Sequence, residues 1–281
     1  PRSWRARGEK RENQDRCCRS EEGTCVEPIL SVQGITMKFG GLVALKDVTF
    51  DVYKGDLLAV IGPNGSGKTT LFNVITGIYS PAGGRIDFSG ADITSKRPYE
   101  TAAMGISRTF QNINLFDSMT VLENVIVGQH STTKAGLWDA IVRSARFKEE
   151  GDVTRRKAEE LVEFVGLGDD MNEIAKNLPY GKQKRLEIAR GLASDPQLLL
   201  LDEPMAGLNP TEKALACELV LAVKQRGVTT ILIEHDMKVV MGISERIEVL
   251  NHGELIARGT PDEVRTNPRV IEAYLGRQRA V

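Results

Sequence analysis

The residues best suited to chemistry lie in one glycine-rich stretch, residues 62–69, with the sequence GPNGSGKT. Its spacing fits G-x-x-x-x-G-K-[ST], a loop whose backbone N–H groups surround phosphate. Glycines let the backbone approach an anion closely, and the positive end of a following helix adds to the attraction. We expect Lys68 to reach the β- and γ-phosphates of a nucleotide and the Thr69 hydroxyl to bind Mg²⁺. The predicted nucleotide contacts in this region are Gly62, Asn64, Gly65, Ser66, Gly67, Lys68, Thr69 and Thr70.

Two acidic residues stand at the end of a second apolar run, where residues 198–201 read LLLL and Asp202 and Glu203 follow. Ligands of α/β sheets bind at the carboxyl ends of the strands. We therefore expect Asp202 to hold Mg²⁺, directly or through water, and Glu203 to orient and deprotonate an attacking water. Paired acids at a strand end can also be simple solvated caps, but a phosphate-binding loop on the same sheet favours the catalytic interpretation.

Composition restricts the class of protein that carries these residues. The chain has 281 residues, a formal net charge of −1, 41% hydrophobic and 27% charged residues, which is ordinary for a globular protein. These values exclude a disordered chain, a fibre and a disulfide-framed miniprotein, and the balanced charge argues against a nucleic-acid partner. No apolar run approaches the roughly 18 residues that span a bilayer, and no signal-peptide pattern is visible. We expect a soluble chain that contacts a membrane only through a partner.

Strands and helices alternate along most of the chain. Strand patterns fall at 30–32, 48–52, 57–61, 85–88, 198–201 and 228–233, and the runs 246–250 and 254–257 form a predicted hairpin. Helical patterns cover 69–75 and about 98–177, and capping signals open helices after Asn209 and Thr260. Alternation of this kind predicts an α/β fold with a parallel sheet that is covered on both faces.

The first 25 residues differ from the rest: they hold seven Lys or Arg, five acids and only five apolar residues. Such a segment buries too little surface to offset the entropy of ordering, so we expect residues 1–26 to be a disordered extension and the globular part to span 27–281. Three of the four cysteines lie here, but without an accompanying histidine a zinc site is disfavoured. The fourth, Cys217, lies in an apolar helical stretch and fits a small core residue.

From about residue 29 to residue 276 the chain resembles the nucleotide-binding subunit of ATP-binding cassette (ABC) transporters. The resemblance rests on the phosphate loop (62–69), Gln111, the segment 178–183 (LPYGKQ), the strand 198–204, the loop 206–209 (AGLN) and His235, in this order. More narrowly, the stretches 108–111 (RTFQ), 206–210, 233–237 (IEHDM) and 267–276 are similar to the ATPase subunits of branched-chain amino-acid importers.

The resemblance implies a P-loop NTPase core, which is a parallel sheet with an antiparallel β edge region and a helical subdomain inserted at about 98–190. It also implies an ATPase that uses ATP and Mg²⁺, works as a dimer with an identical or related second ATPase, and drives integral membrane permease subunits. A periplasmic or extracellular substrate-binding protein would take part indirectly, and nucleic acid would not. The expected location is the cytoplasmic face of the inner (cell) membrane, as a peripheral subunit.

Three further site residues follow from the resemblance. Gln111 would contact the metal or the attacking water, and His235 would bond the γ-phosphate and help to hold that water near Glu203. Phe39, which precedes two glycines, would stack on adenine. The alternatives are an ordinary surface glutamine, a structural histidine, and an aromatic side chain packed in the core. His252 has no comparable context, and we assign it no role.

The segment 178–183, named here the signature segment, would contact the γ-phosphate of a second subunit through Tyr180, Gly181 and Lys182. It departs from the usual LSGGQ, because Pro179 and Tyr180 replace the serine and the first glycine, and Lys182 replaces the glutamine. The missing serine hydroxyl removes one phosphate contact, worth about 1 kcal/mol. A solvated basic face at the start of a helix is the alternative for the lysines of this region.

Two questions stay open from the sequence. The loop after Gln111, with Leu115, Phe116 and Met119, could either receive a helix of the membrane subunit or pack inside the helical region. The rival functions are the ATPase of a lipopolysaccharide-export system, a non-transport ABC ATPase, a small-molecule kinase, and a nucleotide-binding regulator without hydrolysis. Glu203 argues against the regulator, and the signature segment argues against the kinase.

Overall fold

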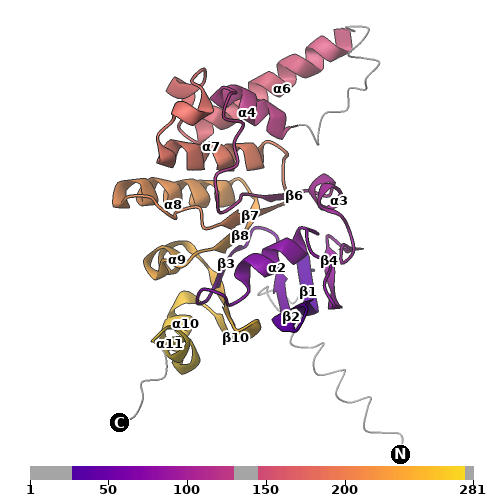
Figure 1. The fold of residues 1–281 in the computed structure, drawn as a ribbon. Coiled ribbons are helices and arrows are strands. Elements are labelled where there is room, and N and C mark those ends of the chain that lie inside the picture. Colours follow the sequence, from indigo (N-terminus) through magenta and orange to yellow (C-terminus); the bar gives the residue numbers. More distant parts are fainter. Residues whose placement is uncertain (1–26, 130–144, 276–281) are drawn as a thin grey trace, which may run out of the picture.

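The computed structural model describes residues 27–129 and 145–275 (Figure 1). The predicted disordered extension, 1–26, lies outside these residues. Two sheets form the centre of the molecule, one mostly parallel and one antiparallel. Within the two described ranges, no helix is both long enough and apolar enough to cross a membrane.

The larger sheet has six strands in the order β10-β9-β3-β8-β7-β6, and only the β9–β10 pair is antiparallel. The strands are β3 (Leu57–Ile61), β6 (Ile106–Arg108), β7 (Leu198–Asp202), β8 (Thr229–Ile233), β9 (Arg246–Asn251) and β10 (Glu254–Gly259). Every residue of β3, β7 and β8 is buried, as expected of parallel strands covered on both faces. The carboxyl ends of these three strands therefore meet at one edge, where the chain continues into the phosphate loop, Glu203 and His235.

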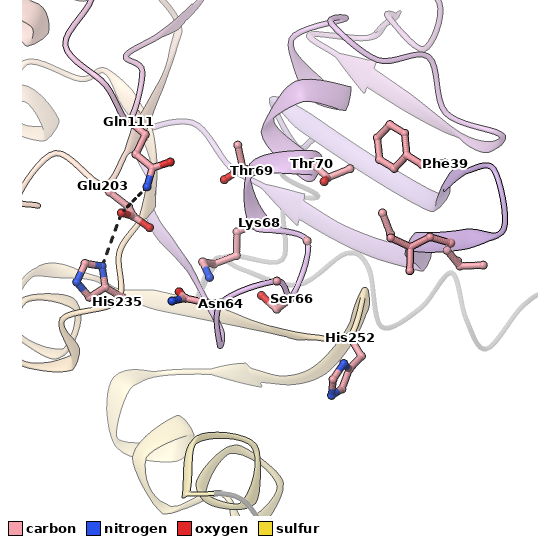
Figure 2. Close-up of a pocket in the computed structure, with 15 residues that line it drawn as sticks. Phe39, Asn64, Ser66, Lys68, Thr69, Thr70, Gln111, Glu203, His235 and His252 are labelled. Atoms are coloured by element: carbon pink, nitrogen blue, oxygen red, sulfur yellow. Dashed lines mark hydrogen bonds and ion pairs between the residues drawn. The ribbon is translucent and has the colours of Figure 1, made fainter.

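The smaller sheet has the order β2-β1-β4-β5 and forms the predicted antiparallel edge region. Its strands are β1 (Leu30–Phe39), β2 (Leu42–Val52), β4 (Gly83–Phe88) and β5 (Ala91–Asp92). The sequence indicated only the ends of the first two strands, because the β1–β2 register shifts three times and breaks the regular alternation. The tip of this hairpin places Phe39 beside the larger sheet's functional edge (Figure 2).

Helices pack beside the parallel sheet and at the carboxyl-terminal end of the chain (Figure 1). They are α2 (Lys68–Ile75), α8 (Pro210–Gln225), α9 (Met237–Ile243), α10 (Pro261–Thr266) and α11 (Pro268–Leu275). Both predicted capping signals are confirmed: Asn209 Oδ1 accepts from the Glu212 N–H at 3.0 Å, and Thr260 Oγ1 accepts from Glu263. These caps fix where α8 and α10 begin.

A group of helices lies at the opposite end of the molecule from α10 and α11 (Figure 1). It contains α4 (Val121–Gly128), α6 (Ala145–Phe164) and α7 (Tyr180–Leu192), with the short turns η2 (Gly168–Asp170) and η3 (Ala175–Asn177). The apolar side chains Ala158, Leu161 and Val162 of α6 are buried in one cluster with residues of α4 and α7. Cys217 of α8 packs against the same cluster and is partly buried.

The helical pattern predicted over 98–177 missed one strand, β6. Only α3 (Pro98–Ala103) precedes it, and β6 joins the parallel sheet by pairing Ile106 with Leu198 and Arg108 with Leu200 of β7. A strand of three residues is too short to show a period, so no pattern in the sequence could indicate it. The strand matters because it delivers Arg108 and Gln111 to the edge that carries the phosphate loop.

A buried acid lies where the two sheets meet. Glu248 of β9 is 2% exposed, its Oε2 has no hydrogen bond, and the Nε of Arg258 lies 3.8 Å from that oxygen. Arg258 also donates to the Thr49 carbonyl of β2, and Arg246 bonds the Asp51 carbonyl of the same strand. Burial raises the pKa of Glu248 to about 7, although both arginines favour its charged form.

We predict that Glu248→Gln raises stability above neutral pH. The folded protein holds the Glu248 proton more tightly than the unfolded chain, so the free energy of unfolding falls as pH rises from about 4.5 to about 7. The glutamine variant lacks this loss, and its advantage should be on the order of 1–3 kcal/mol at pH 8 and small at pH 4.5. Urea unfolding at both pH values measures it. Glu254→Gln, which removes an exposed pair with Lys46, should change stability by less than about 0.5 kcal/mol.

Candidate active site

A cavity of about 770 Å³ lies at the carboxyl edge of the parallel sheet, between the phosphate loop and the tip of the smaller sheet (Figure 2). It gathers most of the residues that the sequence singled out, from five separate parts of the chain. Its lining residues are Phe39, Leu42, Val43, Ala44, Asn64, Gly65, Ser66, Gly67, Lys68, Thr69, Thr70, Gln111, Glu203, His235 and His252. Gly62 and Asp202 lie behind this lining, and the signature segment lies elsewhere. His252, at the β9–β10 turn, is a lining residue that sequence reasoning did not assign.

The phosphate loop is held in place by two close approaches of its backbone. Gly62 has φ +153° and a Cβ there would lie 1.9 Å from the Leu250 carbonyl oxygen. Gly67 has φ +106° and a Cβ there would lie 2.7 Å from the Ala44 carbonyl oxygen. Only glycine fits at either position, so the loop shape depends on β9 and on β2. Burial raises the pKa of the Tyr274 phenol of α11, and the nearby Gly62 backbone opposes that change.

Lys68 lies in the centre of this loop and is 6% exposed. Its Nζ donates to the carbonyl oxygens of Gly62 at 2.7 Å and Pro63 at 3.0 Å. Burial lowers the Lys68 pKa, whereas the carboxylates of Glu203 and Asp202 favour its charged form. The helix α2 begins at Lys68 with no acidic residue in its first turn, so its positive end is not neutralised.

A phosphate group fits the donors of this cradle. The Ser66 hydroxyl is buried and has no hydrogen-bond partner, and it belongs to the loop whose glycines admit an anion. An unpaired buried donor next to a cation and a helix N-terminus is the arrangement that an anion satisfies. The loop is therefore suited to the phosphates of a nucleotide.

Asp202 ends β7 and is 1% exposed. Its Oδ2 accepts from Arg108 at 2.8 Å, while its Oδ1 is buried without a hydrogen bond. Burial raises the Asp202 pKa, and the ion pair with Arg108 opposes that change. Sequence reasoning missed this role of Arg108, although its motif had been noticed. The unpaired Oδ1 is the oxygen that a hard cation such as Mg²⁺ would take, directly or through water.

Glu203, Gln111 and His235 come together from three loops, as the sequence predicted (Figure 2). Glu203 Oε2 accepts from the Gln111 amide at 3.1 Å, and His235 Nδ1 lies 3.9 Å from the same oxygen. Glu203 has φ +50°, a left-handed conformation that is uncommon for a non-glycine residue. Such a strained backbone is typical of functional sites, and here it directs the carboxylate toward the cavity.

Glu234 supports two of these loops and was not identified from the sequence. It is 1% exposed, its Oε1 accepts from the Met205 N–H at 2.9 Å, and its Oε2 accepts from the His235 N–H at 3.2 Å. Burial raises its pKa. Its carboxylate ties the loop after Glu203 to the loop that carries His235. The sequence did contain a signal for this role, because Glu234 stands between an apolar strand and the predicted catalytic residue His235.

Phe39 lies at the rim of the cavity rather than in the core, so its ring does not have the core packing that was the alternative, and stacking on adenine stays a prediction. It is 42% exposed, and it meets Tyr79 edge-on with 5.2 Å between ring centroids. One face of the ring is therefore available to a planar ligand.

The signature segment does not contribute to the cavity of its own chain, because none of Tyr180, Gly181 and Lys182 lines it. The helix α7 begins at Tyr180, and its first turn has neither a side-chain cap nor an acid. Lys182 Nζ lies 2.6 Å from a carboxylate oxygen of Asp170. The start of α7 therefore lies away from the cavity that holds the phosphate loop of its own chain.

Comparison with known proteins decides the family. Residues 45–206 match the family described as "ABC transporter", and residues 254–280 match "Branched-chain amino acid ATP-binding cassette transporter". The chain belongs to the ABC transporter family. This cassette is 46% identical over 251 residues to the high-affinity branched-chain amino acid transport ATP-binding protein LivG of Escherichia coli K12, covering 89% of this chain and 98% of LivG. It is 45% identical over 253 residues to BraF of Pseudomonas aeruginosa, covering 89% and 98%.

Solved structures agree with the fold. An ATP-binding cassette of an ABC transporter in its ADP conformation has a TM-score of 0.78 and 35% identity, covering 89% of this chain and 99% of that one. A dimeric cassette bound to ADP and phosphate has a TM-score of 0.70 and 26% identity, covering 83% and 98%. The predicted family, fold class and ATPase activity are thereby confirmed, and so is ATP as the nucleotide.

We predict that Lys68→Ala lowers ATP turnover by roughly 100-fold or more, because it removes a positioned cation from the phosphates. Phosphate release measures turnover, and titration with a fluorescent ATP analogue measures affinity. Lys96→Ala removes a lysine that pairs with Glu100 outside the cavity and should leave both unchanged. Normal turnover in the Lys68 variant would contradict the assignment of the loop.

Proposed function

We propose that this cassette is the ATP-hydrolysing subunit of an importer for branched-chain amino acids, and that two cassettes close around two ATP molecules. One observation carries the proposal: the phosphate loop, Glu203 and His235 share a cavity from which the signature segment is missing. Two chains placed head to tail supply to each other what each lacks. ATP binding then favours the closed pair, and hydrolysis removes the ligand that holds it closed.

The chain's own residues suit the hydrolytic step. The phosphate loop and the start of α2 bind the phosphates, and Phe39 stacks on the adenine through its exposed face. Glu203 accepts the proton of the water that attacks the γ-phosphorus, and ADP leaves. Gln111 and His235, which lie beside the Glu203 carboxylate, orient that water.

A Mg²⁺ ion fits the donors at this edge of the sheet. Thr69 and Gln111 line the cavity and Asp202 offers its unpaired Oδ1, so these three would hold the ion with the phosphates and water. When bound, Mg²⁺ neutralises charge on the β- and γ-phosphate oxygens.

We predict that Glu203→Gln binds ATP, hydrolyses it poorly and accumulates as a dimer, because the amide cannot take the proton. Size-exclusion chromatography with light scattering, with and without ATP, measures the dimer. Glu218→Gln, at an exposed position of α8, is the control and should behave as the unaltered protein. A Glu203 variant that stays monomeric with ATP would contradict the two-chain proposal.

A second cavity supports docking of the membrane permease. It measures about 290 Å³ and is lined by parts of α3, β6, α4 and α7, including Phe110, Glu187 and Arg190. Large apolar side chains at or near it are exposed, with Ile78 at 44%, Tyr99 at 67% and Phe116 at 44%. Such an apolar groove suits a short helix of a permease. The loop after Gln111 fits both interpretations in part. Leu115 packs inside the helical region, whereas Phe116 is exposed and is available to a helix of the membrane subunit.

The named relatives support the proposed substrate, partner proteins and membrane location. LivG and BraF are named for high-affinity branched-chain amino acid transport, and the cassette covers almost their full length. This supports import with a separate substrate-binding protein, a related second ATPase, and a peripheral position on the cytoplasmic face of the membrane. Lipopolysaccharide export and the non-transport functions are not favoured by these relatives.

We predict that Ile78→Asp weakens association with the permease subunits, because a charge would enter the apolar groove. Co-purification of the tagged cassette with its co-expressed permease measures this, and ATP binding by the isolated cassette should not change. Val153→Asp, at an exposed position of α6 that is 62% exposed and outside the groove, is the matched control. Equal recovery of permease with both variants would exclude the groove as the docking site.

A further inference from the structure

The helix α7 holds the backbone of the loop that carries Gln111, through two buried charged residues. Lys184 is 2% exposed and its Nζ donates to the Gln111 carbonyl oxygen at 2.9 Å. Glu187 is 3% exposed and its Oε1 accepts from the Phe110 N–H at 3.0 Å. The Asn114 backbone also favours the charged form of Glu187, so this carboxylate interacts with the loop on both sides of Gln111.

These two residues lie on one face of α7, with Lys184 Nζ 4.0 Å from Glu187 Oε2. Burying charges is unfavourable, and apolar residues would fill the same space without that cost. The pair is compensated by the backbone groups of the loop, which in turn have no regular secondary structure to satisfy them. The contact therefore fixes a loop of low intrinsic order to a rigid helix. We name the Lys184–Glu187 pair and its loop contacts the α7 staple.

The α7 staple lies between two functional regions of the same chain. Toward the start of α7, Lys184 Nζ is 5.9 Å from the centre of the Tyr180 ring in the signature segment. On the other side, the side chain of Gln111 bonds Glu203. Under the proposed function, the signature segment serves the ATP of the partner, whereas Gln111 and Glu203 serve the ATP of their own chain.

Glu187 also borders the groove proposed for the permease, together with Phe110 and Arg190. A shift of α7 relative to the sheet therefore acts on Gln111 through the staple, whichever neighbour causes it. Neither Lys184 nor Glu187 lines the nucleotide cavity of its own chain, so the staple acts on that site through the Gln111 loop rather than by direct contact.

We propose that Lys184 and Glu187 are positioning residues that make the placement of Gln111 beside Glu203 depend on the position of α7, and hence on engagement of the signature segment by the partner's nucleotide. The inference rests on the proposed two-chain function. It assigns communication between the two ATP sites to a specific set of contacts.

The test uses the full chain with Lys184→Met, which keeps the length of the side chain but removes its donor. Turnover of ATP should fall between about 10- and 100-fold, since small misplacement of a catalytic group has effects of this size. Nucleotide affinity should stay within about twofold, because the cavity is unaltered. Backbone amide exchange over residues 110–114, followed by mass spectrometry, should become faster. Lys184→Arg keeps a donor and should restore most of the turnover and of the protection.

Arg185→Met is the matched control, since Arg185 holds the carbonyl oxygens of Val165 and Gly166 rather than the Gln111 loop. It should lower the melting temperature without changing exchange over 110–114 or turnover. If Arg185→Met has the same effects as Lys184→Met, or if Lys184→Met leaves turnover or exchange unchanged, the staple has no positioning role.

Dimerisation of Glu203→Gln distinguishes a failure of the staple inference from a failure of the proposed two-chain function. The ATP-dependent dimer of Glu203→Gln should persist when Lys184→Met is added, because the phosphate loop and the signature segment are both intact. Loss of the dimer only in the double variant would place Lys184 in assembly and overturn the inference. A Glu203→Gln protein that never dimerises would instead contradict the two-chain function.

Discussion

The structure depends on one constraint: a rigid backbone loop must hold a buried cation ready for phosphate. Lys68 lies among the carbonyl oxygens of its own loop, and that loop keeps its shape because Gly62 and Gly67 are pressed against the backbones of β9 and β2. Both sheets therefore determine one anion site. The antiparallel sheet has a second use, since its hairpin tip carries Phe39 to the rim of the same cavity. A change in the relative position of the two sheets would therefore alter the shape of the phosphate loop through these contacts.

The three acids at this edge, Asp202, Glu203 and Glu234, differ in their hydrogen-bond partners and therefore in the roles that suit them. Asp202 is paired with Arg108 and keeps one oxygen unpaired, while both oxygens of Glu234 accept backbone N–H groups of neighbouring loops. Glu203 has only the Gln111 amide and a histidine at longer range. The carboxylate with the weakest structural attachment is thus the one at the cavity, where a base needs to reach water. Burial raises the pKa of Asp202 and Glu234, so each depends on its donors to remain ionised.

Features encoded within a few neighbouring residues could be predicted from the sequence. The phosphate loop, the two acids at the end of β7, the caps at Asn209 and Thr260, and the β9–β10 hairpin are of this kind, and the structure has each of them. Pairings between distant segments could not be predicted. Arg108 and Asp202 are 94 residues apart in the sequence, and Gln111 and Lys184 are 73 residues apart. No local sequence pattern could therefore predict either contact. The strand β6, which delivers Arg108 and precedes Gln111, is itself too short for a periodic signal.

The start of α7 bears on the proposal that two chains close around two nucleotides. The sequence suggested a basic face there, but the cations are already engaged: Lys182 with Asp170, Lys184 with the Gln111 carbonyl, and Arg185 with the end of α6. What is left for an anion is the uncapped first turn of the helix and the segment around Gly181. Such contacts are individually weak, worth about 1 kcal/mol or less each. A single interface of this kind would not hold two chains, whereas two of them formed at once, each around a phosphate already bound by Lys68, add their contributions. Because both Lys182 and Lys184 already have partners within the described part of the chain, closure under the proposed function would depend on occupancy of both sites.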